Sequence, residues 1–501
     1  MIVRSSPSAA LAPRPATLLI RVDANAQIGS GHFMRCLALA QAWSRSGESV
    51  VFATTSPIKR LNSESSFKAK VISAAAGTEA DAAETRTLAT ELNAAWVILD
   101  GYHFCSSYQQ TLKGAGFRLM VIDDHGHSGS CAADLVLDQN LNASSKLYSN
   151  CTPATRILLG SRFTLLREEF QKWRSWTREF PSLARRVLVT FGGADPVNAT
   201  AKAVAALSSL PQLEVVAVLG AEFQTSLPPS SNVTFLRDVP DMAAVIADCD
   251  LAVTAAGSTC WELALLQTPM ILIPIAENQT PIAEALAAAG AASHLGWHAD
   301  VTVQHLADAV SDLAAAPHLR RELGTAAKTI VDGRGAARVV TQMKALLLQL
   351  RPATHEDCRR VWEWSNEISV RAASFCSDSI LWEDHSRWFS DRLQDSKTVF
   401  YIAEHEVPVG QSRFVLGEAH EALISISVDA AVRGRGLGAA LIVAACERLF
   451  RETDTARIRA LIKLDNTASL QAFDHAGFRR ADDTAFRGNI AAEYVLEREA
   501  A

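Results

Sequence analysis

A histidine and an arginine stand next to two glycines in the segment IGSGHFMRCLALAQAW, residues 28–43. The apolar residues of this segment recur with helical spacing, and LLIRVDA before it is typical of a strand. Gly29 and Gly31 therefore fall where a strand turns into a helix, a place where backbone N–H groups can approach an anion closely. His32 and Arg35 would lie beside the group that this anion carries, where the imidazole could act on it.

Two further turns have the same character. VLVTFGGADP ends a strand with Gly192 and Gly193, and DLAVTAAGSTCWELALL places Ser258 and Thr259 at the start of a helix. A Ser-Thr pair there offers hydroxyls and free N–H groups to a phosphate, and Glu262, one turn later, could accept from ribose hydroxyls. The alternative for this second segment is an ordinary helix N-cap followed by a surface glutamate.

A third glycine loop, VRGRGLG at residues 432–438, follows a strand and opens the apolar helix AALIVAACERLF. Its glycines free the N–H groups of the loop to hold a pyrophosphate, and the helix dipole adds to the attraction. A glycine turn that binds nothing is the alternative.

The composition limits what kind of protein positions these turns. The chain has 501 residues, 49% of them hydrophobic and 20% charged, which is typical of a globular protein with two to four domains. The net charge of −6 and the lack of a basic tract argue against nucleic acid or anionic lipid as a partner. Nine scattered cysteines without a C-x-x-C pair favour reduced thiols, and argue against a disulfide framework or a zinc site.

Neither end of the chain nor its alanine-rich stretch indicates a membrane. The opening residues MIVRSSPSAALAPRPAT lack a continuous apolar region, so they make a poor signal peptide. IAEALAAAGAA is too short to span a bilayer and carries Glu284. We expect a cytoplasmic protein without a membrane partner.

The order of the apolar runs predicts three domains after a disordered lead-in at residues 1–15. Strands such as SVVFAT, AAWVILDGY and FRLMVIDD alternate with helical segments over residues 16–165, and the pattern restarts over residues 166–347. Such alternation predicts an α/β class with two parallel, doubly wound Rossmann-type halves, whose ligand lies outside the carboxyl ends of the strands. Residues 348–501 mix tryptophan-rich helices with strands, which predicts a third domain of the α+β type.

The third domain resembles the GNAT N-acetyltransferases. Arg433, Gly436 and Gly438 fit the family's first signature, and NTASLQAFDHAGF fits the second, with Asn466 and Ser469 in register. WEWSNEISVR and HSRWF are similar to the front of the subgroup that acetylates amino groups on nucleotide-linked sugars. The resemblance implies that acetyl-CoA is the co-substrate. The residues expected to bind it are Val428, Arg433, Gly434, Gly436, Gly438, Asn466 and Ser469.

One residue departs from that pattern. Many relatives have a tyrosine at the position of Phe473, and its hydroxyl protonates the departing CoA thiolate. A phenylalanine has no proton to donate, so either another group serves or the domain is regulatory or inactive. Glu404, His405 and Asp429 are candidates by residue type only, and a solvated-surface role is the favoured explanation for each.

The first two halves resemble GT-B glycosyltransferases, and among them the UDP-sugar hydrolases of pseudaminic acid biosynthesis. The matching pattern is R-x-D followed by G-x-G-H-x-x-R-x-L-x-L-A, with Arg21, Asp23 and His32 in register. GSRFTLLREEF and VTFGGADP are also similar to segments of that family.

This resemblance implies that water removes UDP from UDP-2,4-diacetamido-2,4,6-trideoxy-β-L-altropyranose, with His32 as general base and without a metal. The dipole of the helix disfavours imidazolium at its N-terminus, which keeps the ring able to accept a proton. The alternative is a ring that packs in the turn or only binds phosphate. The residues expected to bind the substrate are Asp23, Gly29, Gly31, Arg35, Tyr102, Gly192, Gly193, Ser258, Thr259, Glu262, Asn278 and Gln279.

Within this set, Asp23 is expected either to brace its loop or to meet the sugar, and Tyr102 with His103 could face the acetamido groups. DDHGH, residues 123–127, has the donor types of a metal site, but a polar strand-to-loop switch is the commoner explanation.

The sequence leaves three functions open. The third domain would acetylate the 4-amino group of a UDP-sugar, and the first two halves would then hydrolyse off UDP. A GT-B transferase would instead pass the sugar to an acceptor, and a non-catalytic third domain would regulate or dock. The oligomeric state and the stereochemistry of the sugar are also open.

Overall fold

The computed structural model describes residues 15–25, 28–58, 61, 67–127, 131–220, 223 and 225–498. The predicted lead-in at residues 1–15 lies outside this part, except for its last residue. The chain divides into two compact units. The first unit contains Ala16–Ser44 and Glu48–Ala336, and the second is formed mainly by the chain from Ala337 on.

The first sheet of the first unit is parallel, in the order β3-β2-β1-β4-β5-β6-β7. Its five inner strands are mostly buried apolar runs, as expected where helices cover both faces of a sheet, whereas the edge strands β3 and β7 are more exposed. The sequence analysis missed β7, which lies in RILLG. The strands are β1 (Thr17–Val22), β2 (Ser49–Thr54), β3 (Lys68–Val71), β4 (Ala94–Asp100), β5 (Leu119–Ile122), β6 (Leu135–Asp138) and β7 (Arg156–Leu159).

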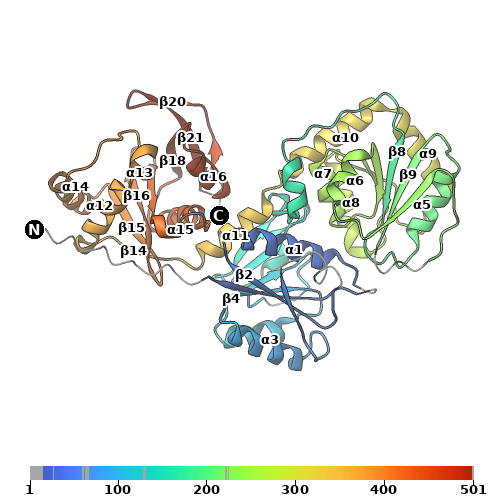
Figure 1. Cartoon of the computed structure of the whole chain (residues 1–501), viewed down its shortest axis with the longest axis horizontal. Helices are drawn as coiled ribbons and strands as arrows, with labels where there is room; N and C mark the ends of the chain where they lie inside the picture. Colours follow the sequence, from blue (N-terminus) through green and yellow to red (C-terminus); the bar gives the residue numbers. More distant parts are fainter. Residues whose placement is uncertain are drawn as a thin grey trace, which may run out of the picture. The chain divides into compact units, whose positions relative to one another are not determined.

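The helices α1 (Gly31–Ser44), α3 (Glu79–Glu91) and α4 (Ser106–Gly114) connect the strands of this sheet (Figure 1). The predicted apolar face of α1 is buried, as Phe33, Cys36 and Trp43 show.

The second sheet of this unit is also parallel, in the order β10-β9-β8-β11-β12-β13. Its strands are β8 (Arg186–Thr190), β9 (Glu214–Leu219), β10 (Val233–Arg237), β11 (Leu251–Thr254), β12 (Met270–Leu272) and β13 (Ser293–His294). Its helices are α5 (Ala199–Ser208), α6 (Met242–Asp248), α7 (Thr259–Leu265), α8 (Thr280–Ala288), α9 (Val303–Ala315) and α10 (Pro317–Ile330).

Both sheets reverse their strand order at one place. In the first sheet the chain runs outward from β1 through β2 and then returns to β4 on the other side of β1. The second sheet does the same at β8 and β11. Loops on either side of such a switch point leave in opposite directions and open a crevice at the carboxyl ends of the strands, where ligands bind.

The sheet of the second unit is mixed, in the order β14-β15-β16-β17-β18-β21-β19, with β20 paired to β21. It begins at β14, so the predicted boundary at 347–348 falls between α11 (Gly335–Ala345) and that strand. The strands are β14 (Gln349–Pro352), β15 (Thr398–His405), β16 (Val407–Leu416), β17 (Glu421–Val428), β18 (Arg457–Lys463), β19 (Arg479–Arg480), β20 (Thr484–Phe486) and β21 (Asn489–Glu497).

Helices cover both faces of this sheet. One apolar cluster joins it to α15 (Leu437–Glu452) and α16 (Thr467–His475), through residues such as Phe414, Leu441 and Phe473. A second cluster joins it to α12 (Cys358–Asn366) and α14 (Trp382–Gln394) through Trp364 and Phe389. The mixed sheet confirms the predicted α+β type.

Two further features concern the cysteines and the helices. All nine cysteines fall within the described residues, and each is a free thiol. Among those residues, no helix combines the length and the apolar character needed to cross a bilayer.

Candidate functional site

The switch point of the first sheet brings His32 and Asp100 together. His32 is the second residue of α1, just beyond β1, and Asp100 is the last residue of β4. Because β1 and β4 are neighbours in the sheet, the ends of these strands lie side by side although the two residues are 68 positions apart. His32 is 9% exposed, whereas Asp100 is buried at 1%.

The contact between the two residues sets the tautomer of the histidine. His32 Nδ1 lies 2.6 Å from Asp100 Oδ1. Arg35 Nη2 lies 3.0 Å from the same ring nitrogen, but a guanidinium can only donate. The carboxylate can only accept, so Nδ1 carries the proton and donates it to Asp100. The lone pair of the ring is then on Nε2.

Arg35 holds Asp100 in place. Its Nε donates to Oδ2 and its Nη2 to Oδ1, both at 2.7 Å, which is the bidentate geometry that suits a carboxylate. Burial raises the pKa of Asp100, but the charge of Arg35 and the contact with His32 outweigh it and hold that pKa below its usual value. Asp100 is therefore a carboxylate at neutral pH.

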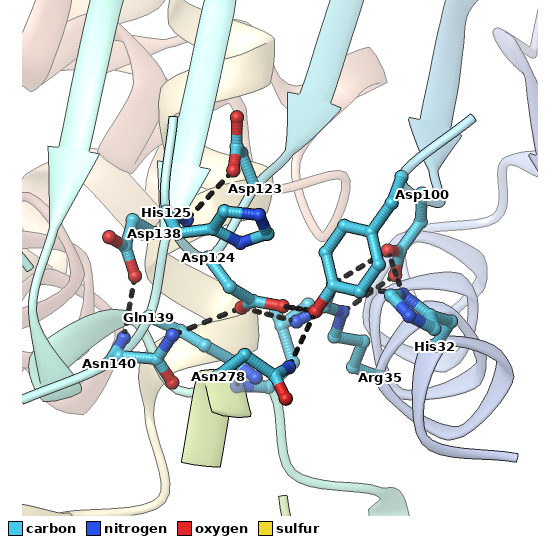
Figure 2. Close-up of polar contacts among 12 residues, drawn as sticks. His32, Arg35, Asp100, Asp123, Asp124, His125, Asp138, Gln139, Asn140 and Asn278 are labelled. Carbon is cyan, nitrogen blue, oxygen red and sulfur yellow. Dashed lines mark hydrogen bonds and ion pairs between the residues drawn. The ribbon is translucent and has the colours of Figure 1, made fainter. Parts of the chain in front are cut away.

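A second chain of hydrogen bonds runs from Arg35 to the other sheet (Figure 2). Arg35 Nη1 donates to Asp124 Oδ1 at 2.7 Å, and the Tyr102 hydroxyl donates to Asp124 Oδ2 at 2.9 Å. Asn278 Nδ2 in turn donates to the Tyr102 oxygen at 2.9 Å. Since Asn278 belongs to the half that carries the second sheet, this last bond links the two halves across the crevice.

For the DDHGH segment, residues 123–127, a polar strand-to-loop switch was favoured over a metal site. In the structure this segment forms a turn and supplies charged side chains. Asp123 accepts from the backbone N–H groups of His125 and Gly126, and its Oδ1 lies 3.1 Å from His127 Nδ1. In the described part of the chain, no three His, Cys, Asp or Glu side chains gather in a way that could hold a metal. Burial raises the pKa of Asp124, but Arg35 lowers it further, to below its ordinary value.

Two cavities occupy the crevice, with volumes of about 290 and 250 Å³. His32, Arg35 and Tyr102 line the smaller one, which we call the histidine cavity. Apolar side chains such as Val218 and Met242 line much of the larger one, which we call the apolar cavity.

Seven small residues line both cavities and form the wall between them. They are Gly29, Ser30, Gly31, Gly192, Gly193, Ser258 and Thr259. A Cβ at Gly193 would come within 2.6 Å of Ser30 Oγ, so only glycine permits this close approach of the two halves. Backbone N–H groups and hydroxyls are what a diphosphate needs, and this wall is rich in both.

The other predicted substrate residues divide between the two cavities. Asn278 and Gln279 line the histidine cavity, and Glu262 lines the apolar cavity. Glu262 Oε1 accepts from Arg167 Nη2 at 2.8 Å, which fixes its carboxylate at the edge of that cavity.

Asp23 is the exception, since it lines neither cavity. Its Oδ1 accepts from the backbone N–H and the hydroxyl of Thr55, and its Oδ2 lies 2.7 Å from Arg21 Nη1. Of its two expected roles, the geometry fits bracing of the loop. His103 Nε2 lies 3.5 Å from Asp23 Oδ2.

Sequence reasoning missed several residues of the site. Asp100 and Asp124, the partners of the histidine and the arginine, were not singled out for this role, and neither were Asn140 and Arg167. A usable signal was present, because Asp100 ends one strand and Asp124 follows the next at the edge where ligands bind.

The glycine loop of the second unit has the predicted strand–turn–helix setting. Gly434 and Gly436 have φ values of 77° and 74°, which favour glycine, and α15 starts directly after them. The Arg433 guanidinium is held within the protein, because its Nε donates to the carbonyl of Val428 at 3.0 Å and its Nη1 donates to Glu367 Oε2 at 2.6 Å. Gly438 lies against the side chain of Val428.

The second signature of this unit caps a helix. Asn466 Oδ1 accepts from the N–H of Ser469 at 3.1 Å, at the start of α16. Phe473 on the same helix is 4% exposed and packs edge to face against Phe478 at 4.9 Å between ring centroids.

Two adjacent strands of this unit diverge next to the glycine loop. β17 pairs in parallel with β18 over residues 421–423, while both strands continue beyond that pairing. The end of β17 leads through Val428 into the loop. The divergence therefore leaves backbone groups of β17 available beside the predicted acetyl-CoA residues.

The fold and these sites define the class of protein. Two parallel Rossmann-type sheets of a GT-B-like kind precede a mixed sheet of a GNAT-like kind in one chain. Residues 186–335 match the family model described as the glycosyltransferase family 28 C-terminal domain. Residues 348–479 match the one described as the acetyltransferase (GNAT) domain.

Curated relatives resemble parts of the chain at low identity. An uncharacterized protein of Methanocaldococcus jannaschii is 22% identical over 412 residues, covering 77% of this chain and 81% of the relative. A Campylobacter jejuni protein named UDP-2,4-diacetamido-2,4,6-trideoxy-beta-L-altropyranose hydrolase is 23% identical over 289 residues, covering 54% of this chain and 97% of the relative.

A Helicobacter pylori protein combines that hydrolase name with pseudaminic acid cytidylyltransferase, and is 28% identical over 187 residues. The match covers 37% of this chain and about a third of the relative, 34%. Among solved structures, the glycotransferase of kitacinnamycin aligns with 66% of this chain and 99% of its own, at 18% identity and a TM-score of 0.48.

Proposed function

We propose that the first unit hydrolyses UDP-2,4-diacetamido-2,4,6-trideoxy-β-L-altropyranose to UDP and the free sugar. The observation that carries this proposal is the histidine cavity, in which His32 has its Nδ1 bound to a carboxylate, beside a wall of small polar residues. The names of the C. jejuni and H. pylori relatives support the choice of substrate.

In the proposed complex, the base and ribose of UDP occupy the apolar cavity, and the sugar occupies the histidine cavity. The diphosphate then lies along the wall that both cavities share, where N–H groups and hydroxyls hold its charge. Glu262 is placed to accept from the ribose hydroxyls, and Tyr102 and Asn278 face the sugar.

His32 acts as general base in the proposed mechanism. A water molecule gives a proton to Nε2 as its oxygen attacks the anomeric carbon of the sugar. The bond from that carbon to the diphosphate oxygen breaks, and its electron pair leaves with UDP. Asp100 keeps the proton on Nδ1 and stabilises the imidazolium that forms, while Arg35 keeps Asp100 oriented.

For the second unit we propose N-acetylation of the 4-amino group of the UDP-sugar precursor, with acetyl-CoA as donor. The glycine loop at residues 432–438 would hold the pyrophosphate of CoA, and the free edge of β17 would hold the acetyl group. Phe473 lies within the apolar cluster and has no proton to give, so the acid that protonates the CoA thiolate is a different group. The product of this step is the substrate of the first unit.

The test is product analysis by mass spectrometry and NMR with the diacetamido UDP-sugar and no added carbohydrate. We expect UDP and free sugar from the wild-type chain, and a loss of turnover of about 10²- to 10⁴-fold in His32→Ala. UDP binding should persist in this variant, because the wall is unchanged. UDP release that requires a second carbohydrate would replace the hydrolase with a GT-B transferase.

A further inference from the structure

One face of β16 carries two polar atoms, Gln411 Oε1 and Arg413 Nε, that have no hydrogen-bond partner among the described residues. Gln411 and Arg413 lie on the same face of the strand, because successive side chains alternate between the two faces. Their neighbours across the ladder are Ile402 and Phe400 of β15, which belong to the apolar cluster under α12 and α14. On the other side their neighbours are Ser427 and Ser425 of β17, so these two polar residues lie between an apolar strand and a strand that presents hydroxyls.

Gln411 presents an unsatisfied acceptor. It is 8% exposed, and its Nε2 donates to Ser427 Oγ at 3.1 Å. Its Oε1 is buried and has no hydrogen-bond partner. A buried amide oxygen without a partner costs about 1–3 kcal/mol, so this position calls for a donor that the fold does not supply. Ser427 directly precedes Val428, one of the residues expected to bind acetyl-CoA.

Arg413 presents an unpaired positive charge. Its Nε is buried without a partner, and its guanidinium lies over the Trp388 ring, 4.8 Å from the centroid. Burial lowers the pKa of Arg413 to about 10, and the charged groups that act on it, Arg392 and Arg487, are also positive. Arg392 has a carboxylate of its own, since its Nη1 donates to Asp395 Oδ2 at 2.8 Å. Arg413 has none.

We propose that this face of β16 binds an amino sugar linked to a diphosphate, with the amine at Gln411 and the diphosphate at Arg413. Residues two apart on a strand are separated by about 7 Å. That spacing is of the order of a hexose ring together with its glycosidic oxygen, so the strand can contact both ends of the sugar. Gln411 Oε1 accepts from the amine, which turns the nitrogen lone pair toward the acetyl group at the end of β17.

This inference rests on the proposed acetyltransfer and specifies which acceptors the domain takes. A positive charge without a carboxylate selects acceptors that carry phosphate, since only these neutralise it. Arg487 on the β20–β21 turn and Arg392 on α14 add to the positive field around Arg413. Unphosphorylated amino sugars would lack that contact and bind weakly.

The experiment measures acetyl transfer by the full chain, as loss of thioester absorbance, with three acceptors. These are a UDP-linked 4-amino-4-deoxy hexose, its 1-phosphate, and the same amino sugar without phosphate. Arg413→Gln should raise KM by about tenfold or more for both phosphate-bearing acceptors and leave KM for acetyl-CoA unchanged. Its KM for the unphosphorylated sugar should equal that of the wild type.

Gln411→Leu provides the matched contrast, because it should weaken binding of all three acceptors to a similar degree. Arg413→Lys keeps the charge and should give an intermediate KM, and it replaces Arg413→Gln should that variant fail to fold. Arg480→Gln removes an exposed arginine that is paired with Asp483, and it should change nothing.

The outcomes distinguish failure of this acceptor site from failure of the proposed acetyltransfer on which it rests. If the wild-type chain acetylates the UDP-linked acceptor but Arg413→Gln does so with unchanged KM, the site is wrong and the acetyltransfer stands. If Arg413→Gln weakens all acceptors equally, Arg413 has only a structural role and the site is also wrong. If the wild-type chain acetylates none of the three, the proposed acetyltransfer itself fails.

Discussion

Arg35 and Arg413 show two different uses of a buried guanidinium. Arg35 in the first unit donates to the carboxylates of Asp100 and Asp124, and its pKa lies well above the usual value because those charges outweigh burial. No carboxylate in the described part of the second unit pairs with Arg413, and burial lowers its pKa. The charge of Arg35 is therefore neutralised within the protein, whereas Arg413 can still pair with an anionic ligand.

This contrast separates preorganisation from recognition. A base that must act on water needs a fixed tautomer, so its partners are satisfied before any substrate arrives. A residue that must select an anion gains most when the ligand supplies the missing charge. Satisfied networks therefore indicate where chemistry is positioned, and unsatisfied groups indicate where a ligand binds.

Among the tests of this comparison, Asp100→Asn should have the largest effect on activity. An amide can donate to His32 Nδ1, which moves the ring proton to Nε2 and removes the base. We expect kcat for hydrolysis to fall by about 10²- to 10⁴-fold with little change in KM. The double variant with His32→Ala should be no slower than His32→Ala alone, because both changes remove one function. If the losses of kcat in the two single variants multiplied in the double variant, they would contradict a joint role of Asp100 and His32.

A smaller effect concerns the link between the two halves. Tyr102→Phe removes the hydroxyl that bonds Asp124 and Asn278, and Asn278→Ala removes the other partner. Each should raise KM for the UDP-sugar by about three- to tenfold. Both substitutions remove the same hydrogen bond between Asn278 and Tyr102, so the KM of the double variant should be similar to that of either single variant. Tyr401→Phe, which removes a hydroxyl bonded to Glu452 in the second unit, is the control and should leave this KM unchanged.

The smallest expected effect is on thermal stability. It tests how burial and a nearby charge shift the pKa of a carboxylate. Burial, with the nearby charge of Asp124, raises the pKa of Asp138 to about 7. The folded state thus binds more protons than the unfolded state between about pH 4 and 7, and stability falls as the pH rises through that window. Asp138→Asn avoids this loss, so its unfolding midpoint should exceed that of the wild type by about 2–4 °C at pH 8, but not at pH 4.

Calorimetry at the two pH values measures this difference. Asp308→Asn, which changes an exposed carboxylate on α9, is the matched control and should show no difference between the two pH values. An equal gain at both pH values in Asp138→Asn would mean that ionisation of Asp138 is not the cause.

The sequence predicted those parts of the site that depend on local chain order. Gly29 and His32 follow one strand, and Ser258 follows another, so each strand–turn–helix segment contains its own signal. The class of the fold was predictable for the same reason, because parallel sheets require buried apolar strands separated by helices. The mixed sheet of the second unit was likewise visible as a change of pattern near residue 348.

The sequence marked Asp100 and Asp124 as residues at strand ends, but which residues they would contact depends on the order of the strands in the sheet. Asp100 meets His32 only because β4 returns to the side of β1, and Asp124 meets Arg35 because β5 lies beside β4. Asp23 is a related case, since its motif position left bracing of the loop and contact with the sugar both open, and its contacts with Thr55 and Arg21 fit the first. A motif fixes residue types, but the hydrogen-bond partners decide the role.

Hydrolysis of the diacetamido UDP-sugar in water enriched in ¹⁸O tests the central claim most directly. If His32 activates water toward the anomeric carbon, one ¹⁸O enters the free sugar and none enters UDP. Label in the β-phosphate of UDP would mean that water attacks phosphorus instead, and it would contradict the role given to the histidine cavity.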